Sequence, residues 1–458
     1  MKRRSLLAAS AAFAAALGQT RPARSQALSS SKAQSGRAKI VFWHAMSGPP
    51  GETLNLLANG FNISQNSAEI STVFKGTYPD TLNAALAASG TGEAPHLVQV
   101  FELGTVAMLA AGRAVKLTSE LIKETGGILD PANYVASIRG NVSLTDGKLA
   151  AMPFNASTAV MWYNKDAFGK AGLDPEKPPL TWQQVVDTCR ALKAKTSGAT
   201  PTWTPSTTSW PSWIQLEQFG AIHNLPFATK SNGLDGLDAE LKFNGPGQVK
   251  HLQRLLDMAK EGLFKYGGRD DAGDAMFPAG EAAIAFNSSG ARGAISRNAQ
   301  FKWAVAPLPH DPDILAKPLN SLIGGASLWT MTAPGRTEDE YKAVAAFLAF
   351  IGLPENDARW HQQTGYVPVT TAGYERTRQQ GYYEKNPGAD LAVQQLTRGQ
   401  VTANSKGIRL GRMLELRGII EEELEKALQG QQNAKQALDA AVNRGNKILR
   451  DFQKSAKA

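Results

Sequence analysis

The sequence contains only one cysteine, Cys189, among 458 residues. A single cysteine cannot form an internal disulfide, and thiol catalysis would need a neighbouring base that the sequence does not reveal. Cys189 falls within the apolar pattern of a helix predicted for residues 182–195, where a cysteine usually behaves as a small buried hydrophobic side chain. The cysteine content therefore excludes a disulfide-stabilised scaffold.

The sequence also lacks the motifs of common catalytic and metal sites. Its six histidines are scattered, without the spacing of zinc ligands or of a base beside a nucleophile. It has no Gly-x-Ser-x-Gly turn, no P-loop and no dinucleotide-binding fingerprint. Carboxylates are plentiful, but the sequence alone assigns no pair of them to acid–base chemistry. We therefore expect a protein that is not an enzyme and that uses no metal ion and no cofactor.

The apolar run near the N-terminus is too short to span a bilayer. A basic start (residues 2–4) precedes an Ala/Leu-rich run over residues 6–17, and small residues at 25–27 provide a cleavage site. This order predicts a secreted protein with a cleaved signal peptide over residues 1–27 and a flexible N-terminus over 28–38. The two arginines of the basic start also fit a loose twin-arginine signal, although we favour the general secretory route.

The excess of positive charge is small once the signal peptide is removed. The chain has a formal net charge of +9, and the loss of the five basic residues in 1–27, where no acid is present, lowers it to +4. The other Lys and Arg residues are scattered among acids, which argues against nucleic-acid binding. A mild preference for small anionic ligands is compatible with this charge.

A length of 458 residues requires two large lobes or domains.

Strands and helices alternate in the first part of the mature chain. Short strands are predicted at residues 39–43, 69–74 and 96–101, with helices at 52–61 and 81–88 between them. This alternation favours a mostly parallel sheet covered by helices on both faces. Further helices are predicted at residues 182–195, 248–261 and 338–352, and further strands at 282–286, 303–306 and 327–331.

The tail over residues 412–452 reads as helical, with a break near Gly430. Its inner stripe consists of Leu438, Val442, Gly445, Leu449 and Phe452. The acidic segment 421–425, followed by Lys426, predicts a second face that is open to solvent.

The segment 153–182, PFNASTAVMWYNKDAFGKAGLDPEKPPLTW, describes a chain that enters a second lobe. An apolar strand leads into Asn164, a short helix follows, and a Pro-rich turn precedes the helix that opens with Thr181 and Trp182. This order predicts a hinge over residues 154–158 followed by a new α/β lobe. A ligand would then bind in the cleft between the two lobes.

Polar clusters follow the predicted strands in both halves of the chain. They are KGTY (75–78), FELG (101–104), NAST (155–158), SWPSW (209–213), NSSG (287–290), GGAS (324–327), TGY (364–366) and GIR (407–409). Hydroxyls and backbone N–H groups suit an anion or a polyol, an arginine suits a phosphate, and tryptophans suit the apolar face of a sugar or glycerol unit. A single cluster of this kind is typical of an ordinary turn. The recurrence of such clusters at the ends of several strands favours a binding site.

These clusters and several longer blocks carry a resemblance to a known family. The blocks are the segment 153–182, IQLEQFGAIHNLPFATKSNGLDG (214–236), IGGASLW (323–329), WHQQTGYVPVT (360–370) and GYYEKNPGAD (381–390). The mature chain resembles the periplasmic sn-glycerol-3-phosphate-binding proteins of ABC importers. These belong to the extracellular solute-binding proteins related to maltose-binding protein.

The resemblance implies an α/β fold of the two-lobe periplasmic-binding-protein type (type II). Each lobe would be a mixed sheet flanked by helices, and a hinge would join the two. Lobe I is expected over residues 39–156 and 305–360, and lobe II over residues 157–304 and 361–458. The protein would be a periplasmic monomer that captures glycerol 3-phosphate or glycerophosphodiesters such as glycerophosphocholine. It would deliver them to permease subunits at the inner membrane that work with a cytoplasmic ATPase.

The resemblance also implies the binding residues, each through its own motif. They are Tyr78, Glu102, Ser157, Trp210, Trp213, Ser288, Gly325, Tyr366 and Arg409. Arg409, the hydroxyls and the Gly325 amide would hold the phosphate, while Glu102 would accept hydrogen bonds from the glycerol hydroxyls. Residues 198–209, which include Trp203, form a longer loop than the family's equivalent.

Two other functions are compatible with parts of the sequence. The aromatic loop residues also suit an oligosaccharide receptor of a related ABC importer, although an arginine among hydroxyl clusters fits an anion better. A secreted phosphodiesterase or glycosidase is the second alternative, and the lack of a metal cluster or nucleophile motif argues against it.

Overall fold

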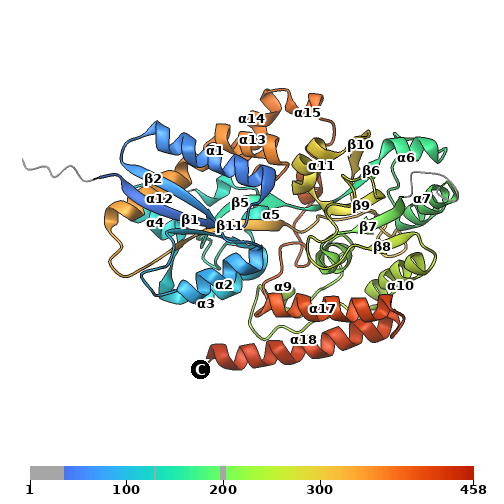
Figure 1. Ribbon diagram of the computed structural model, residues 1–458. Coiled ribbons are helices and arrows are strands. Elements are labelled where there is room, and N and C mark those ends of the chain that lie inside the picture. The colour runs from blue at the N-terminus through green and yellow to red at the C-terminus, as the bar shows by residue number, and fades with distance from the viewer. Residues whose placement is uncertain (1–35, 128–129, 196–202, 458) are drawn as a thin grey trace, which may run out of the picture. The chain divides into compact units, whose positions relative to one another are not determined.

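The computed structural model describes residues 36–127, 130–195 and 203–457 (Figure 1). The predicted signal peptide and most of the stretch 28–38 lie outside the described residues, and Ala38 already belongs to the first strand. Within these ranges no helix combines the length and the apolar character that a membrane span requires.

The first sheet runs in the order β2–β1–β3–β11–β4, and β5 pairs with β11. Its strands are β1 (Ala38–His44), β2 (Ala68–Phe74), β3 (Leu97–Phe101), β4 (Val115–Lys116), β5 (Met152–Ser157) and β11 (Gly324–Met331). The strands β1, β2 and β3 are parallel, as the alternating pattern predicts. The sheet as a whole is mixed, because β11 arrives from far along the chain and runs antiparallel to β3, β4 and β5.

Aromatic packing fixes two helices on one face of the first sheet. Phe42 of β1 meets Phe347 of α12 (Glu338–Ile351) edge to face at 6.2 Å between ring centroids. Phe61 of α1 (Gly48–Ser64) meets Phe347 at 5.3 Å. The helices α2 (Tyr78–Ala88) and α3 (Thr105–Ala110) lie on the other side of the sheet in Figure 1. The first sheet is therefore covered on both faces, as predicted.

The second sheet runs in the order β10–β6–β9–β7–β8. Its strands are β6 (Ala159–Asn164), β7 (Thr204–Thr208), β8 (Phe264–Tyr266), β9 (Ala282–Ser288) and β10 (Trp303–Ala306). Strand β7 was predicted as a loop, because its sequence TPSTT has no apolar run. It is nevertheless buried, since Ser206 and Thr207 donate hydrogen bonds to the carbonyl oxygens of Leu263 (2.7 Å) and Lys265 (2.9 Å). Hydroxyl groups that find partners in this way lose little by burial.

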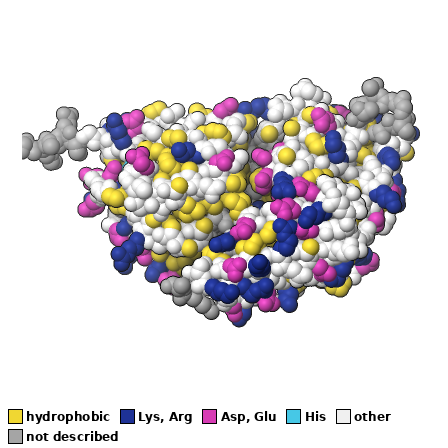
Figure 2. Space-filling model, turned by 60° about the horizontal axis from the view of Figure 1, so that its bottom comes forward, with side chains coloured by type: hydrophobic (Ala, Val, Ile, Leu, Met, Phe, Trp, Pro, Cys, Tyr) yellow, Lys and Arg dark blue, Asp and Glu magenta, His cyan; other side chains and the backbone are white. Residues whose placement is uncertain are grey.

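The remaining helices surround the two sheets, and on the face that Figure 2 shows, Lys and Arg side chains are interspersed with Asp and Glu. These helices are α4 (Thr118–Glu124), α5 (Ala136–Arg139), α6 (Lys165–Lys170), α7 (Trp182–Ala194), α8 (Phe219–Ile222), α9 (Thr229–Gly233), α10 (Pro246–Lys260), α11 (Arg292–Asn298), α13 (Pro354–Thr364), α14 (Thr371–Gln379), α15 (Tyr382–Lys385), α16 (Leu391–Leu396), α17 (Met413–Leu428) and α18 (Ala434–Lys457). A π-helical segment spans Trp213–Gln218.

Cys189 of α7 is fully buried, and burial raises the pKa of its thiol to about 12. The prediction of an inert core cysteine is therefore confirmed.

The chain passes from the first sheet to the second at Thr158, between β5 and β6. Thr158 is fully buried, and its hydroxyl lies 2.8 Å from Ser321 Oγ and 2.7 Å from the carbonyl oxygen of Leu322. The lobe boundaries at 156/157 and 304/305 stay predictions. The strands run slightly past both of them, since β5 includes Ser157 and β10 ends at Ala306.

The C-terminal helices α17 and α18 pack against each other as a hairpin, with α17 on the inner side (Figure 1). Leu438 and Leu449 are buried, as the predicted stripe requires. The prediction of a solvated acidic face is wrong for Glu421 and Glu423, which are 4% and 3% exposed. Both sides of α17 face protein. Glu423 accepts hydrogen bonds from Lys426 and Arg444. Burial raises the pKa of Glu421 to about 7.

Candidate ligand-binding pocket

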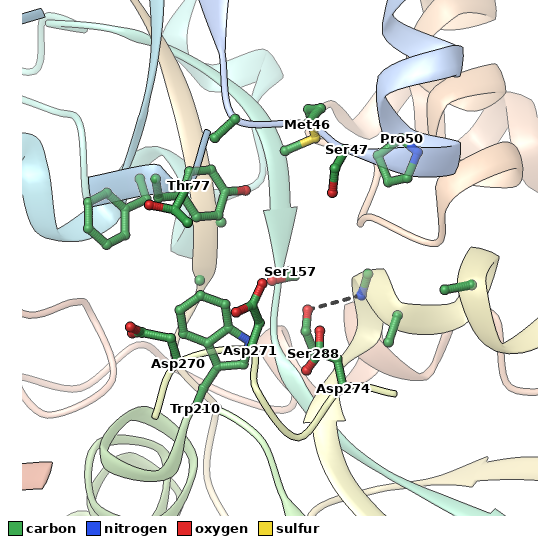
Figure 3. Close-up of a pocket in the computed structure, with 18 of the residues that line it drawn as sticks. Met46, Ser47, Pro50, Thr77, Ser157, Trp210, Asp270, Asp271, Asp274 and Ser288 are labelled. Carbon is green, nitrogen blue, oxygen red and sulfur yellow. Dashed lines mark hydrogen bonds between the residues drawn. The ribbon is translucent and has the colours of Figure 1, made fainter. Parts of the chain in front are cut away.

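A cavity of about 360 Å³ lies between loops of the first sheet and loops of the second (Figure 3). Its lining follows the carboxyl ends of strands β1, β2, β3, β5, β7, β8 and β9. Ligands of α/β proteins usually bind at this edge, where several loops converge. The position of the cavity therefore favours a small-molecule site between the two halves of the fold.

Eight of the nine predicted site residues line this cavity. They are Tyr78, Glu102, Ser157, Trp210, Trp213, Ser288, Gly325 and Tyr366. They come from segments far apart in the sequence, and the fold brings them together. Because these residues were assigned from separate motifs, their convergence on one cavity supports the choice of site.

Tyr78 is held at the start of α2 by a well-formed helix cap. Thr77 and Asp80 exchange the two hydrogen bonds of a capping box, and Pro79 occupies the first turn, where its missing N–H is not needed. The Tyr78 ring stacks on Phe101 with an interplanar angle of 2°, and its hydroxyl accepts a hydrogen bond of 2.7 Å from Asn155. Burial raises the pKa of Tyr78 well above its usual range. Tyr78 is thus a fixed, neutral wall of the pocket.

Gly325 lets strand β11 approach β5 at the pocket. It has φ +93°, and a Cβ added there would lie 2.0 Å from the carbonyl oxygen of Asn155. The β11–β5 register shifts between Ala326 and Ser327, one residue beyond this contact. Only glycine fits this conformation and this spacing.

The two tryptophans reach the pocket in different ways. Trp210 has a left-handed φ of +48°, and its backbone N–H donates a 2.6 Å hydrogen bond to the carbonyl oxygen of Asp270. Figure 3 shows its indole projecting into the pocket, with Asp270 on one side and Asp271 on the other. Trp213 opens the π-helical segment, an element frequent at functional sites. Trp213 is 5% exposed, and its indole N–H has no hydrogen-bond partner among the described residues.

The pocket also contains an arginine that the sequence analysis missed, Arg417 of α17. It is 5% exposed, and it donates two hydrogen bonds of 2.8 Å to Glu217 and one of 3.1 Å to Glu102. Burial alone would lower the pKa of Arg417, but Glu217 and Glu102 outweigh it and raise this pKa. Burial raises the pKa of Glu102, against the opposing effect of Arg417.

The sequence did contain a signal for Arg417. It follows Leu416 directly and precedes Ile420 by three residues, so the helical spacing places it at the edge of the buried stripe of α17. A charged residue on a buried stripe needs a partner, and here Glu217 is that partner.

The ninth predicted residue, Arg409, is not among the residues that line this cavity. Arg409 lies in the connection between α16 and α17. Its guanidinium donates to the carbonyl oxygens of Gly140 (3.2 Å), Asn141 (2.8 Å) and Ser143 (2.9 Å). The side chain thus ties its own loop to the segment after α5, because these carbonyls offer an arginine several acceptors at once.

The family model described as bacterial extracellular solute-binding protein matches residues 57–389. The chain belongs to this family. It is 46% identical to the sn-glycerol-3-phosphate-binding periplasmic protein UgpB of Salmonella typhimurium, over 92% of this chain and 94% of that protein. The protein of the same name from Escherichia coli O6:K15:H31 is 45% identical over 98% of each chain.

Solved structures of solute-binding proteins share the fold. UgpB of Mycobacterium tuberculosis in complex with glycerophosphocholine has a TM-score of 0.75, with 21% identity over 91% of this chain and 100% of that one. Maltose-bound MalE3 of T. maritima has a TM-score of 0.71, with 16% identity over 91% and 100% of the two chains. These similarities confirm the two-lobe α/β fold of the maltose-binding type for this solute-binding protein.

Three further carboxylates of this solute-binding protein line the pocket and were not predicted. Asp270, Asp271 and Asp274 lie in the loop between β8 and β9. Asp274 accepts a 3.1 Å hydrogen bond from Asn287, and burial raises its pKa to about 6. Partial desolvation in the pocket also raises the pKa of Asp270, whose side chain is otherwise exposed, although Arg417 acts in the opposite direction. The loop sequence GGRDDAGDAMFPAG resembles an ordinary polar turn, so its place at the pocket depends on the fold.

Proposed function

We propose that this protein is the periplasmic receptor of an ABC importer and captures sn-glycerol 3-phosphate and glycerophosphodiesters in the pocket between its two sheets. The observation that carries the proposal is the combination in one cavity of a buried guanidinium, several hydroxyls and aromatic rings. A guanidinium and hydroxyl groups recognise a phosphate, and aromatic rings cover the carbons of a glycerol unit. The names of the relatives at 45–46% identity support the same ligand class.

The roles of the pocket residues follow from their chemistry. Arg417 takes the phosphate-binding role that the sequence analysis gave to Arg409, since Arg417 is the lining residue with a permanent positive charge. The hydroxyls of Ser157, Ser288 and Tyr366 and the backbone N–H of Gly325 complete the set of donors.

The glycerol unit would occupy the remaining walls of the pocket. Glu102 accepts hydrogen bonds from the glycerol hydroxyls, and the rings of Tyr78 and Trp213 cover the carbon atoms of the glycerol unit.

The receptor acts after removal of the signal peptide over residues 1–27 and works as a monomer. It hands its ligand to permease subunits of the inner membrane, which are driven by a cytoplasmic ATPase. It binds no nucleic acid and performs no chemistry on its ligand. Its lobes close on the ligand through the crossing at residues 154–158.

Titration calorimetry and thermal unfolding of the mature chain test this function. Glycerol 3-phosphate and glycerophosphocholine should bind, and each should raise Tm, because a ligand at about 100 times its Kd adds about 2.7 kcal/mol to the stability. Free glycerol and maltose, the controls for the polyol and the oligosaccharide, should leave Tm unchanged. Binding of maltose without binding of either phosphate ligand would make the protein an oligosaccharide receptor. Release of choline from glycerophosphocholine during incubation would make it an enzyme.

A further inference from the structure

The pocket of this receptor carries more negative than positive side chains. Its charged lining residues are Arg417 and four carboxylates, Glu102, Asp270, Asp271 and Asp274. The guanidinium is also bonded to Glu217 behind the pocket wall. The positive charge of Arg417 is therefore already balanced within the protein before any ligand arrives.

The loop carboxylates are not neutralised by neighbouring cations. Among the described residues, neither Asp270 nor Asp271 forms an ion pair, since the adjacent Arg269 is turned to Glu425 and bonds it at 2.8 and 2.5 Å. In the same ranges, no group of three or more His, Cys, Asp or Glu side chains is arranged to hold a metal ion. Two exposed carboxylates without a cationic partner in these ranges suit an ammonium group.

Two of the four lining carboxylates, Asp270 and Asp271, lie further out in the pocket than Arg417. The donor end is deep: Arg417 and Trp213 are each 5% exposed, and the indole N–H of Trp213 has no partner among the described residues. Asp270 and Asp271 are exposed and stand at the rim. The buried guanidinium of Arg417 favours a ligand whose anionic part lies inside, and the exposed carboxylates favour a ligand whose cationic part lies outside.

An aromatic face completes the outer part of the pocket. The indole of Trp210 stands between Asp270 and Asp271 in Figure 3. Its strained backbone is fixed by the hydrogen bond to Asp270, so the ring and the acidic loop are positioned together. An aromatic ring flanked by carboxylates attracts an ammonium group, and quaternary ammonium groups in particular are recognised by such surfaces.

We propose that Trp210, Asp270, Asp271 and Asp274 form a cation subsite that selects glycerophosphodiesters whose second alcohol carries an ammonium group. The inference rests on the proposed function and adds a ranking within the ligand class. Glycerol 3-phosphate brings about two negative charges into a pocket that is already negative, which like-charge repulsion opposes. A zwitterionic diester such as glycerophosphocholine brings one negative charge for the deep donors and one positive charge for the rim.

Calorimetry on the mature chain with four ligands tests the ranking. Glycerophosphocholine and glycerophosphoethanolamine should each bind at least about tenfold more tightly than glycerophosphoglycerol, which has a neutral second alcohol, and than glycerol 3-phosphate. If glycerol 3-phosphate or glycerophosphoglycerol binds as tightly as the ammonium diesters, the cation subsite is wrong and the receptor function stands. If none of the four ligands binds, the proposed function fails as well.

The double variant Asp270→Asn/Asp271→Asn tests whether these two aspartates cause the preference for ammonium diesters. It keeps the shape of both side chains, so glycerophosphocholine should lose about tenfold or more in affinity while glycerophosphoglycerol changes by less than about twofold. Asp187→Asn, on an exposed position of α7 outside the pocket, is the matched control and should change neither. Equal losses for all four ligands would show that the aspartates only support the loop, and would overturn the proposal.

Discussion

Replacing Arg417 by alanine should abolish binding of glycerol 3-phosphate and of its diesters and should lower the free energy of unfolding by about 3–5 kcal/mol. The loss of binding follows because the pocket keeps its carboxylates and loses its guanidinium. The loss of stability follows because Glu217, which is 3% exposed, remains as an uncompensated buried charge. Denaturant unfolding and calorimetry measure the two effects separately.

The two effects of Arg417 can be separated with a second variant. Arg417→Met combined with Glu217→Gln removes both charges and should recover part of the stability without recovering phosphate binding, because the uncompensated charge is gone but the donor is still missing. Arg409→Ala is the control, since Arg409 donates to backbone carbonyls outside the pocket. Arg417 has no part in binding if Arg417→Ala keeps the wild-type affinity and Arg409→Ala loses it.

Replacing Gly325 by alanine should lower the free energy of unfolding by about 2–4 kcal/mol and disrupt the pocket. The new Cβ would lie 2.0 Å from the carbonyl oxygen of Asn155, in a backbone conformation that L-residues avoid. Asn155 cannot easily move, because its side chain accepts a hydrogen bond from Gln99 and donates one to Tyr78. The expected result is a lower Tm together with weaker ligand binding.

Gly335 provides the matched control for this substitution. It also has a positive φ, +77°, but a Cβ added there would meet no atom within 4 Å. Gly335→Ala should therefore show only the conformational cost of about 1–2 kcal/mol and no change in affinity. If the two alanine variants behave alike, the contact with Asn155 has no effect of its own.

The sequence predicts most of the helices and strands, but it does not predict how all of the strands pair. The parallel strands β1, β2 and β3 were predictable because strands and helices alternate along that part of the chain. The antiparallel pairing of β11 in the first sheet was not predictable, since it depends on a crossover from the edge of the second sheet. Strand β7 was missed for a different reason: its core-facing groups are hydroxyls, which only the partners supplied by the fold allow to be buried.

The site was predictable where binding residues stand in motifs at strand ends. Ser157 and Ser288 lie at the ends of β5 and β9, and both reach the pocket. Arg417 was missed because it stands inside a regular helix, where a binding residue has no motif around it. Arg409 was assigned from a polar loop motif, yet the loop uses this arginine to bind backbone carbonyls.

The hydrogen bond between Arg417 and Glu102 joins residues that are 315 positions apart. Glu102 and Glu217 are both synthesised long before Arg417, which neutralises them. A partly synthesised or partly exported chain therefore holds two acids without their partner. Such a chain cannot close its cleft tightly, because burying unpaired charges is costly. Ligand affinity should therefore appear late during folding, only after the hairpin of α17 and α18 has docked.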